Sequence, residues 1–408
     1  MRILEQHTIA RRTMGECLLQ GDYPEEALPF LEKEAAEEPK QWTHLNSLGI
    51  CYRILGDYDS SIASFEKALA LEPRAMQIHH NLGMAYEGLG RFDEAIDHYA
   101  VSCSNSANTD SQYALGCCLL RDRKFDLAAS FWETGRVNKR SAIVLPGIEE
   151  WRGQELAGKR LLVIREGGYG DVFWLLRYLK PLKDAGATVA FYVFKSQISL
   201  LSGHPWIDRL MCEEDDIDAH DFDYQVPLWS VMLRIVDAIP MPMSEPYIKV
   251  RPVEIPVPRQ APKIGLCWKA GELLSRRKVR SIQDEYLGAF ADIPVNWVSL
   301  VLGEMPDWCV AGINPSPCGW KATAEVIAGL DLVISADTSV FHLAACMGKP
   351  TWVFLPLLRD WKFFRSGETS EWYPSVRIFQ NSHPASFQPV VDKMVSALNA
   401  WVGKEVTA

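Results

Sequence analysis

A short glycine-rich segment could hold a catalytic carboxylate. Gly167, Gly168 and Gly170 follow an apolar run, and Asp171 comes directly after them. Because glycine has no Cβ atom, backbone N–H groups in such a segment can approach a ligand closely. Asp171 could act there as a general base that removes a proton from a hydroxyl group. The same carboxylate could equally cap the helix that follows, and the residue types favour neither role.

A second group of polar residues lies between two apolar runs in the last quarter of the chain. It contains Asp337, Thr338 and His342. We predict that Asp337 caps a helix here, which places Thr338 and His342 on one helix face, because they are four residues apart. A phosphate over the helix start could bind its N–H groups and the Thr338 hydroxyl. The alternative is a capped helix with a buried histidine.

The third candidate is a group of basic residues. Lys269 ends an apolar run, and the segment Arg276–Arg280 contains four basic residues out of five. Arg and Lys side chains bind phosphate oxygens through charge-assisted hydrogen bonds, so this cluster could hold a diphosphate. A solvated charged surface is the alternative, although the cluster interrupts an otherwise acidic chain.

Other chemistries have less support. Residues 213–218 together with Asp221 and Asp223 are acidic and could bind a divalent cation, but a solvated acidic loop is the simpler interpretation. The glycine segment does not follow the dinucleotide-binding pattern. Phosphate-binding, nucleophile-elbow and zinc-protease motifs are also absent from the sequence, which removes the usual signals of kinases and hydrolases.

The elements that position these residues alternate between strands and helices. A buried strand at 159–165, a helix at 172–185 and a strand at 188–193 form a βαβ unit. A proline-rich linker at 251–262 precedes a second series. That series has strands near 263–268, 296–302, 331–335 and 351–355, and helices near 282–291, 321–330 and 338–347. We therefore expect two Rossmann-like lobes, at 141–255 and 256–408, with a ligand cleft between them.

Residues 1–140 have a different pattern, an internal repeat. Leu48, Gly49, Tyr52 and Gly56 recur 34 residues later as Leu82, Gly83, Tyr86 and Gly90. This period is typical of tetratricopeptide repeats, in which antiparallel helix pairs stack into a superhelix. Weaker units precede and follow these two. An unrelated helical bundle is the alternative. Such arrays bind a partner or hold a homodimer together.

Composition narrows the remaining classes. The 408 residues are 48% hydrophobic and 23% charged, which is ordinary for a globular protein, and the net charge of −10 lowers the expectation of a nucleic-acid partner. The ten cysteines include no Cys-x-x-Cys pair, so most are expected to be buried thiols in a reducing compartment. The sequence shows neither an apolar run long enough to span a membrane nor a signal peptide, and a cytoplasmic location is expected.

Taken together, four segments resemble bacterial glycosyltransferases of the heptosyltransferase-like group. They are residues 168–171, 264–269, 280–281 and 337–350. Asp360, Trp361 and residues 372–374 are similar to members that carry tetratricopeptide repeats. The resemblance implies a GT-B fold after the repeats, a nucleotide-diphosphate-sugar donor held mainly by the second lobe, inversion at the anomeric carbon, and no essential metal or further cofactor. The layout is also similar to O-linked N-acetylglucosamine transferases, whose motifs match less well.

The resemblance also implies roles for individual residues. Asp171 would be the general base and would follow the glycine loop Gly167, Gly168 and Gly170. The implied donor-binding residues are Lys269, Arg276, Arg280, Ser281, Asp337, Thr338, Ser339 and His342. Ser339 stands where heptosyltransferases usually have glycine, so the donor sugar is left open.

Three hypotheses follow. The first is an inverting glycosyltransferase whose acceptor is a protein segment, a glycan or a nucleic acid. The second is a scaffold in which the repeats recruit a partner and the GT-B module is inactive. The third is a nucleotide-sugar epimerase, which would need no acceptor and hence no repeats.

Overall fold

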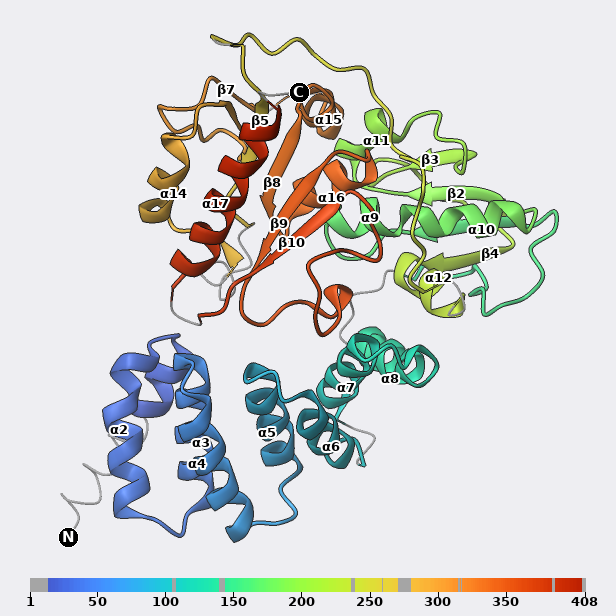
Figure 1. The fold of residues 1–408 in the computed structure, drawn as a ribbon. Coiled ribbons are helices and arrows are strands. Elements are labelled where there is room, and N and C mark those ends of the chain that lie inside the picture. Colours follow the sequence, from blue (N-terminus) through green and yellow to red (C-terminus); the bar gives the residue numbers. More distant parts are fainter. Residues whose placement is uncertain are drawn as a thin grey trace. The chain divides into compact units, whose positions relative to one another are not determined.

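The computed structural model describes residues 14–104, 108–138, 144–235, 239–258, 260–270, 280–314, 316, 318–383 and 386–405. The chain divides into two compact units. One contains residues 1–139 with 360–362, and the other contains residues 140–359 with 363–408. The first unit is helical, and the second contains two parallel sheets (Figure 1). No helix in the described part is long and apolar enough to cross a membrane.

The first unit is a series of antiparallel helices. After a helical segment at 14–20 come α2 (Pro24–Glu37), α3 (Trp42–Leu55), α4 (Tyr58–Leu71), α5 (Met76–Gly88), α6 (Phe92–Ser102), α7 (Thr109–Arg121) and α8 (Phe125–Asn138). Helix α3 packs against α4, α5 against α6, and α7 against α8. Asp57 is the N-cap of α4, where its carboxylate accepts a hydrogen bond from the Ser60 N–H at 3.1 Å.

The repeated glycines allow these helix pairs to pack closely. A Cβ atom on Gly49 would lie 2.6 Å from the Phe65 ring, and one on Gly83 would lie 2.6 Å from the Tyr99 ring. Gly116 is restricted in the same way by α8. Since real Cβ atoms do not approach other atoms this closely, only glycine fits at these positions. The glycines that recur with the 34-residue period therefore lie where the paired helices approach each other closely.

A tyrosine–glutamate hydrogen bond recurs with the same period. The Tyr52 hydroxyl donates to Glu32 at 2.7 Å, and the Tyr86 hydroxyl donates to Glu66 at 3.4 Å. Both residues of the second pair are 34 positions after those of the first. Glu32 lies in α2, so the leading unit makes the same contact as the unit that follows it.

The first sheet of the second unit has four parallel strands in the order β3-β2-β1-β4. They are β1 (Arg160–Ile164), β2 (Thr188–Tyr192), β3 (Arg209–Met211) and β4 (Tyr224–Pro227). The helices are α9 (Tyr169–Leu175), α10 (Leu179–Asp184), α11 (Lys195–Leu201) and α12 (Leu228–Arg234). The stretch predicted as helical at 172–185 is helical from Tyr169 to Asp184, but a 3₁₀ turn, η1 (Leu176–Tyr178), divides it into α9 and α10.

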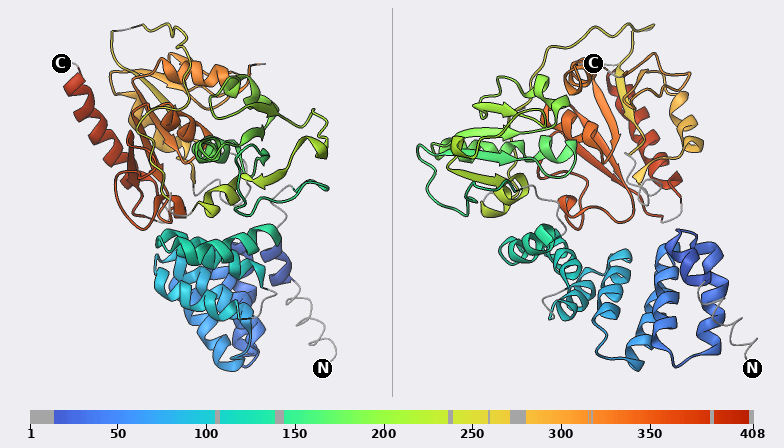
Figure 2. Two further views of the ribbon diagram at one scale, coloured as in Figure 1. Left: turned by 90° about the vertical axis from the view of Figure 1, so that its right-hand side faces the viewer. Right: turned by 180° about the vertical axis from the view of Figure 1, so that it is seen from behind.

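The second sheet has six parallel strands in the order β10-β9-β8-β5-β6-β7. They are β5 (Lys263–Cys267), β6 (Asn296–Ser299), β7 (Ala311–Gly312), β8 (Leu332–Ala336), β9 (Thr351–Leu355) and β10 (Val376–Gln380). Its helices are α14 (Asp284–Ala291), α15 (Trp320–Ala328), α16 (Ser339–Cys346) and α17 (Gln388–Glu405). Apolar residues of α14 and α17 pack with those of the central strands in one core, and α17 lies along the strands in Figures 1 and 2.

Within the second unit, helices of the two sheets meet. Helix α9 packs against α16, and α11 packs against α15. The described part of the predicted linker, residues 251–258 and 260–262, contains neither helix nor strand. Its Val253 N–H donates to the Glu325 carbonyl of α15 at 3.1 Å, so the linker lies against the second sheet's helices.

Candidate functional site

The glycine loop connects β1 to α9. Gly167 has a φ of +69°, a conformation that favours glycine, and a Cβ atom there would lie 2.8 Å from the Asp171 Cγ atom. Helix α9 begins after Gly168, whose N–H donates to the Asp171 carboxylate at 2.7 Å. Asp171 is therefore not the N-cap residue. It lies in the first turn of α9, and its carboxylate accepts the hydrogen bond from the N-cap residue, Gly168.

Thr338, and not Asp337, caps α16. The Thr338 backbone is extended, and its hydroxyl accepts a hydrogen bond from the Phe341 N–H at 3.5 Å. The Ser335 hydroxyl lies 3.1 Å from that of Thr338. The expectation that Asp337 caps this helix is wrong, because a helix takes one N-cap residue and the next position has the required backbone and hydroxyl.

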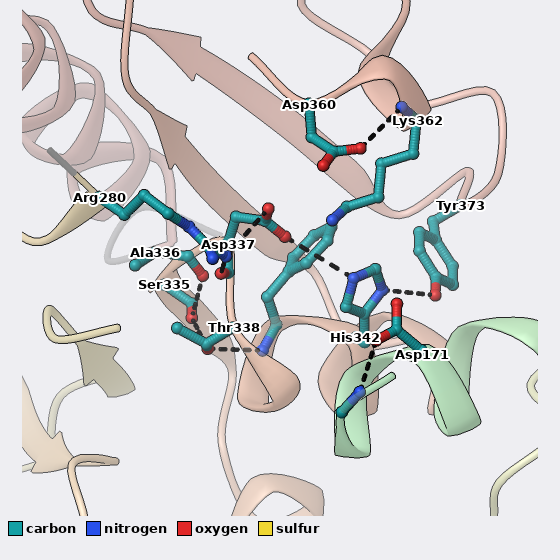
Figure 3. Close-up of polar contacts among 12 residues, drawn as sticks. Asp171, Arg280, Ser335, Ala336, Asp337, Thr338, His342, Asp360, Lys362 and Tyr373 are labelled. Carbon is teal, nitrogen blue, oxygen red and sulfur yellow. Dashed lines mark hydrogen bonds and ion pairs between the residues drawn. The ribbon is translucent and has the colours of Figure 1, made fainter. Parts of the chain in front are cut away.

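Asp337 instead binds side chains. Its carboxylate lies between the Arg280 guanidinium, at 3.2 Å, and the His342 Nε2 atom, at 3.7 Å (Figure 3). The Asp337 carbonyl also accepts a hydrogen bond from Arg280. The Asp337 side chain is only 8% exposed and that of His342 only 5%. The hydrogen bond from Arg280 holds this buried carboxylate in one orientation, with the imidazole of His342 on its other side.

His342 has a partner on its other nitrogen as well. Its Nδ1 atom lies 3.0 Å from the Tyr373 hydroxyl, and the Trp174 ring of α9 stacks on its imidazole at 6.0 Å between centroids. Burial raises the pKa of Tyr373 well above 10, so this hydroxyl stays protonated at neutral pH.

Gly170 brings the two sets of predicted residues together. It lies where α9 meets α16, and a Cβ atom there would lie 3.0 Å from the His342 Cδ2 atom and 3.3 Å from the Ser339 Cα atom. The loop that carries Asp171 therefore lies next to the first turn of α16 (Figure 3). Residues more than 160 positions apart in the sequence meet at one place.

Two of the predicted donor-binding residues have partners of their own. The Lys269 ammonium forms an ion pair with Glu304 and lies 3.9 Å from Asp284. The Ser281 hydroxyl accepts a hydrogen bond from the Ala270 N–H at 2.9 Å and is buried. Arg276 is another predicted donor-binding residue. It lies outside the described residues, as does all of the segment 271–279.

The acidic segment of the first sheet is paired with cations. Glu214 lies 2.6 Å from Lys195, Asp221 lies 2.9 Å from Arg209, and Asp223 lies 3.2 Å from Arg160. Across the described ranges, His, Cys, Asp and Glu side chains form no cluster of three or more that could hold a metal ion.

A cavity of about 1000 Å³ lies elsewhere, between α17 and the edge strand β10. Trp352, Arg377 and Trp401 are among its lining residues, which include none of the predicted site residues.

The helical unit matches a known family model. The model for the tetratricopeptide repeat covers residues 40–108. The chain contains tetratricopeptide repeats. Helices α3 to α6 lie in the matched range, and these tetratricopeptide repeats contain none of the predicted site residues, all of which lie in the other unit.

Comparisons over longer ranges give a curated relative and several solved structures. Protein FlbA of Caulobacter vibrioides is 25% identical over 299 residues, which are 62% of this chain and 48% of FlbA, so the chain spans about half the length of this relative.

Solved structures match at low scores. A Thermobaculum terrenum O-GlcNAc transferase mutant is 14% identical, covers 87% of this chain and 83% of its own, and has a TM-score of 0.34. A MamA double mutant is 22% identical with a TM-score of 0.31, over 33% of this chain and 76% of its own. The type IV pilus biogenesis factor PilW is 18% identical with a TM-score of 0.31, over 33% and 64%.

Sequence reasoning did not identify the contacts of three residues, Tyr373, Trp174 and Arg177. Tyr373 belongs to a segment that the resemblance had indicated, but no spacing linked it to His342. Trp174 and Arg177 appeared only as residues of a predicted helix. Their contacts reach across the chain, and nothing in the local pattern near residue 174 indicates them.

Proposed function

We propose that this chain is an inverting glycosyltransferase of the GT-B arrangement, which moves a sugar from a nucleotide-diphosphate-sugar donor to an acceptor hydroxyl. The observation that carries the proposal is the contact of Gly170 with Ser339 and His342. This contact supports a site in which the Asp171 carboxylate lies beside the polar group formed by Asp337, Thr338 and His342 (Figure 3). A catalytic base and a donor site must meet in this way for a sugar to be transferred between them.

The donor would bind to the second lobe, residues 256–408. Thr338, Ser339 and the following N–H groups form the first turn of α16, where backbone donors and the helix dipole favour a diphosphate. Arg280 adds a positive charge beside Asp337. Lys269 would exchange its Glu304 partner for a phosphate oxygen. In this proposal these groups, with Arg276, stabilise the leaving diphosphate and no metal is needed.

The first lobe, residues 141–255, would supply the base. Asp171 accepts the proton of the acceptor hydroxyl as the oxygen attacks the anomeric carbon. The bond between that carbon and the diphosphate oxygen breaks, and the electron pair leaves with the nucleotide diphosphate. Because attack and departure are on opposite faces of the sugar, the anomeric configuration inverts.

The tetratricopeptide repeats would bind the acceptor or a partner. We favour a protein segment as acceptor, since stacked helix pairs present an extended surface suited to a peptide. A glycan, a nucleic acid or a second copy of the chain would be the alternative occupants. The ten cysteines are all free thiols, which favours a reducing compartment such as the cytoplasm.

The test is transfer from a panel of nucleotide sugars by the full chain and by Asp171→Asn. Asparagine keeps an oxygen that can accept the Gly168 hydrogen bond but cannot take up the proton, so turnover should fall by about 10²-fold or more. Asp184→Asn, an exposed carboxylate paired with Lys180 on α10, is the matched control and should leave turnover unchanged. Equal turnover in Asp171→Asn would remove Asp171 as base. Absence of transfer from every donor would remove the proposed activity.

One observation favours the scaffold hypothesis. Lys269 and Arg280 both have carboxylate partners within the chain, Glu304 and Asp337, so neither needs a ligand to balance its charge. A thermal-shift screen separates the two functions, because a ligand that binds the folded state raises the melting temperature. A rise with nucleoside diphosphates favours the transferase, and the absence of any shift favours the scaffold.

A further inference from the structure

Arg177 is a completely buried cation. It lies in η1, between α9 and α10, and its exposed fraction is 0%. Its guanidinium donates to the carbonyl oxygens of Trp174 at 2.9 Å, Met241 at 2.7 Å and Trp372 at 2.7 Å, and to the Tyr247 hydroxyl at 3.0 Å. None of these four partners is a carboxylate. The charge is therefore stabilised by dipoles, and their number matters because an unsatisfied buried guanidinium is costly.

The four acceptors belong to three separate segments. Trp174 is in α9, Met241 and Tyr247 are in the segment that leads away from the first sheet, and Trp372 precedes β10 of the second sheet. The Tyr247 N–H donates in turn to the Cys346 carbonyl at the end of α16. Arg177 can satisfy its N–H groups only while all three segments hold this arrangement. It therefore fixes the Trp372 backbone relative to α9.

Tyr373, the next residue, connects Arg177 to the candidate site. The Arg177 guanidinium lies 4.5 Å from the centroid of the Tyr373 ring, a cation–π distance. The Tyr373 hydroxyl lies 3.0 Å from the His342 Nδ1 atom. Arg177 thus holds Tyr373 both through the preceding carbonyl and through its ring. The position of the hydroxyl beside His342 depends on both contacts.

The two neighbours of His342 together favour one tautomer. A protonated phenol can donate or accept, but a carboxylate accepts only, so Asp337 on the Nε2 side favours a hydrogen on Nε2 and leaves Nδ1 to accept from the Tyr373 hydroxyl. Nε2 faces the Asp337 carboxylate at 3.7 Å, and Arg280 binds the other oxygen of that carboxylate. The Nε2–H group then faces the Asp337 carboxylate at an ion-pair distance that is longer than a hydrogen bond.

We propose that Arg177 and Tyr373 are positioning residues, which hold His342 in its Nε2–H tautomer and thereby orient Asp337 at the proposed donor site. The inference rests on the proposed function for its catalytic consequence. The tautomer itself is a property of the free protein. Arg177 makes that property depend on the packing of α9 against the second sheet's helices.

The test variant is Tyr373→Phe in the full chain, because phenylalanine keeps the ring over Arg177 and removes only the hydroxyl. Long-range ¹⁵N–¹H spectra of the histidine rings report the tautomer directly. The His342 signals are assigned by their loss in His342→Gln. We expect a wild-type His342 with the proton on Nε2 and a mixture of tautomers in Tyr373→Phe. Tyr286→Phe, which removes a hydroxyl that lies 3.3 Å from Ser386, is the control and should leave the His342 signals unchanged.

Kinetics supply the second readout. If transfer is found, Tyr373→Phe should lower kcat by about tenfold, because about this factor corresponds to the loss of one hydrogen bond. The KM for the donor should stay within about twofold of the wild-type value. Arg177→Lys keeps the charge but cannot reach all four acceptors, and it should move the His342 signals in the same direction. Unchanged His342 signals in Tyr373→Phe overturn the inference, even if Arg177→Lys does not fold. Absence of transfer in the wild type would overturn the proposed function and leave the tautomer measurement valid.

Discussion

A Cβ atom on Gly170 would lie 3.0 Å from the Cδ2 atom of His342, although the two residues belong to the helices of different sheets. The glycine therefore serves a purpose beyond access of backbone N–H groups to a ligand. It lets α9 approach α16 closely, and the proposed shared site of Asp171 and Asp337 depends on this approach.

Gly170→Ala should therefore destabilise the second unit. The contact is tighter than most Cβ contacts, so His342 or the α16 backbone must move by a few tenths of an ångström. We expect a loss of about 1–3 kcal/mol, measured by calorimetry, with a parallel loss of any transferase activity. Gly288→Ala is the control, because its Cβ position in α14 has no atom within 4 Å other than those of its chain neighbours and its own helix backbone, and it should stabilise the chain by about 0.5–1 kcal/mol. Equal stabilisation by both substitutions would contradict the close approach.

Asp57→Ala should weaken the first unit by removing the N-cap of α4. The lost hydrogen bond to the Ser60 N–H costs about 1 kcal/mol. Asp59→Ala also removes an acidic residue from this turn, but Asp59 is exposed and is not the cap residue. Thermal unfolding of the full chain should therefore show a clearly larger decrease for Asp57→Ala. Equal decreases would assign the effect to charge near the helix dipole and not to the cap.

Thiol labelling should distinguish two cysteines from the other eight. Cys17 and Cys318 are exposed, whereas Cys51, Cys118, Cys212, Cys267, Cys309 and Cys346 are buried, and Cys103 and Cys117 are intermediate. Burial raises the pKa of Cys309 to about 12 and that of Cys346 to about 11, so little thiolate forms at neutral pH.

Intact-mass measurements with iodoacetamide at pH 7.5 should show two rapid additions in the native protein and ten after denaturation. The double variant Cys17→Ser/Cys318→Ser should show no rapid addition. A third rapid addition in the wild type would indicate that a buried thiol is accessible.

The first unit should lose stability as the pH falls below neutrality. His79 and His98 lie with their Nδ1 atoms 2.9 Å apart, and burial lowers the pKa of each below 6.5. Since the unfolded chain binds protons at pH values where the folded pair does not, the stabilising contribution is complete above about pH 6.5 and decreases below it.

Melting temperatures between pH 7.5 and pH 5.5 check this expectation. The double variant His79→Gln/His98→Gln should have a smaller pH dependence than the wild type. The control His220→Gln removes an exposed histidine of the other unit and should retain the wild-type slope. If the double variant keeps that slope as well, the pair does not cause the pH dependence.

The fold was largely predictable at strands whose residues are buried on both faces of the sheet. The strands β1, β2, β5, β8 and β9 lie within one or two residues of their predicted positions, because strands covered on both faces appear as uninterrupted apolar runs. The helix predicted at 172–185 is interrupted at Leu176–Tyr178, where Arg177 binds backbone carbonyls of distant segments. No local pattern encodes such long-range contacts.

The site was predictable in its parts but not in its pairings. Glycine spacing indicated the loop before Asp171, and apolar runs on either side indicated the group around His342. The partners Tyr373 and Glu304 could not be found, because each lies 31 to 35 positions from the residue that it contacts. The N-cap was assigned one residue too early, since Asp and Thr both have cap preference and only the backbone conformation separates them.

The recurring bonds of Tyr52 with Glu32 and of Tyr86 with Glu66 give two successive junctions of the array the same contact. A duplicated 34-residue unit inserted after Pro73 would contain both residue types of this contact. Its tyrosine could bind the glutamate of the preceding unit, and its glutamate could bind the tyrosine of the following unit. For this contact, the array could lengthen by a whole unit through gene duplication without a new pair of residues at the junction.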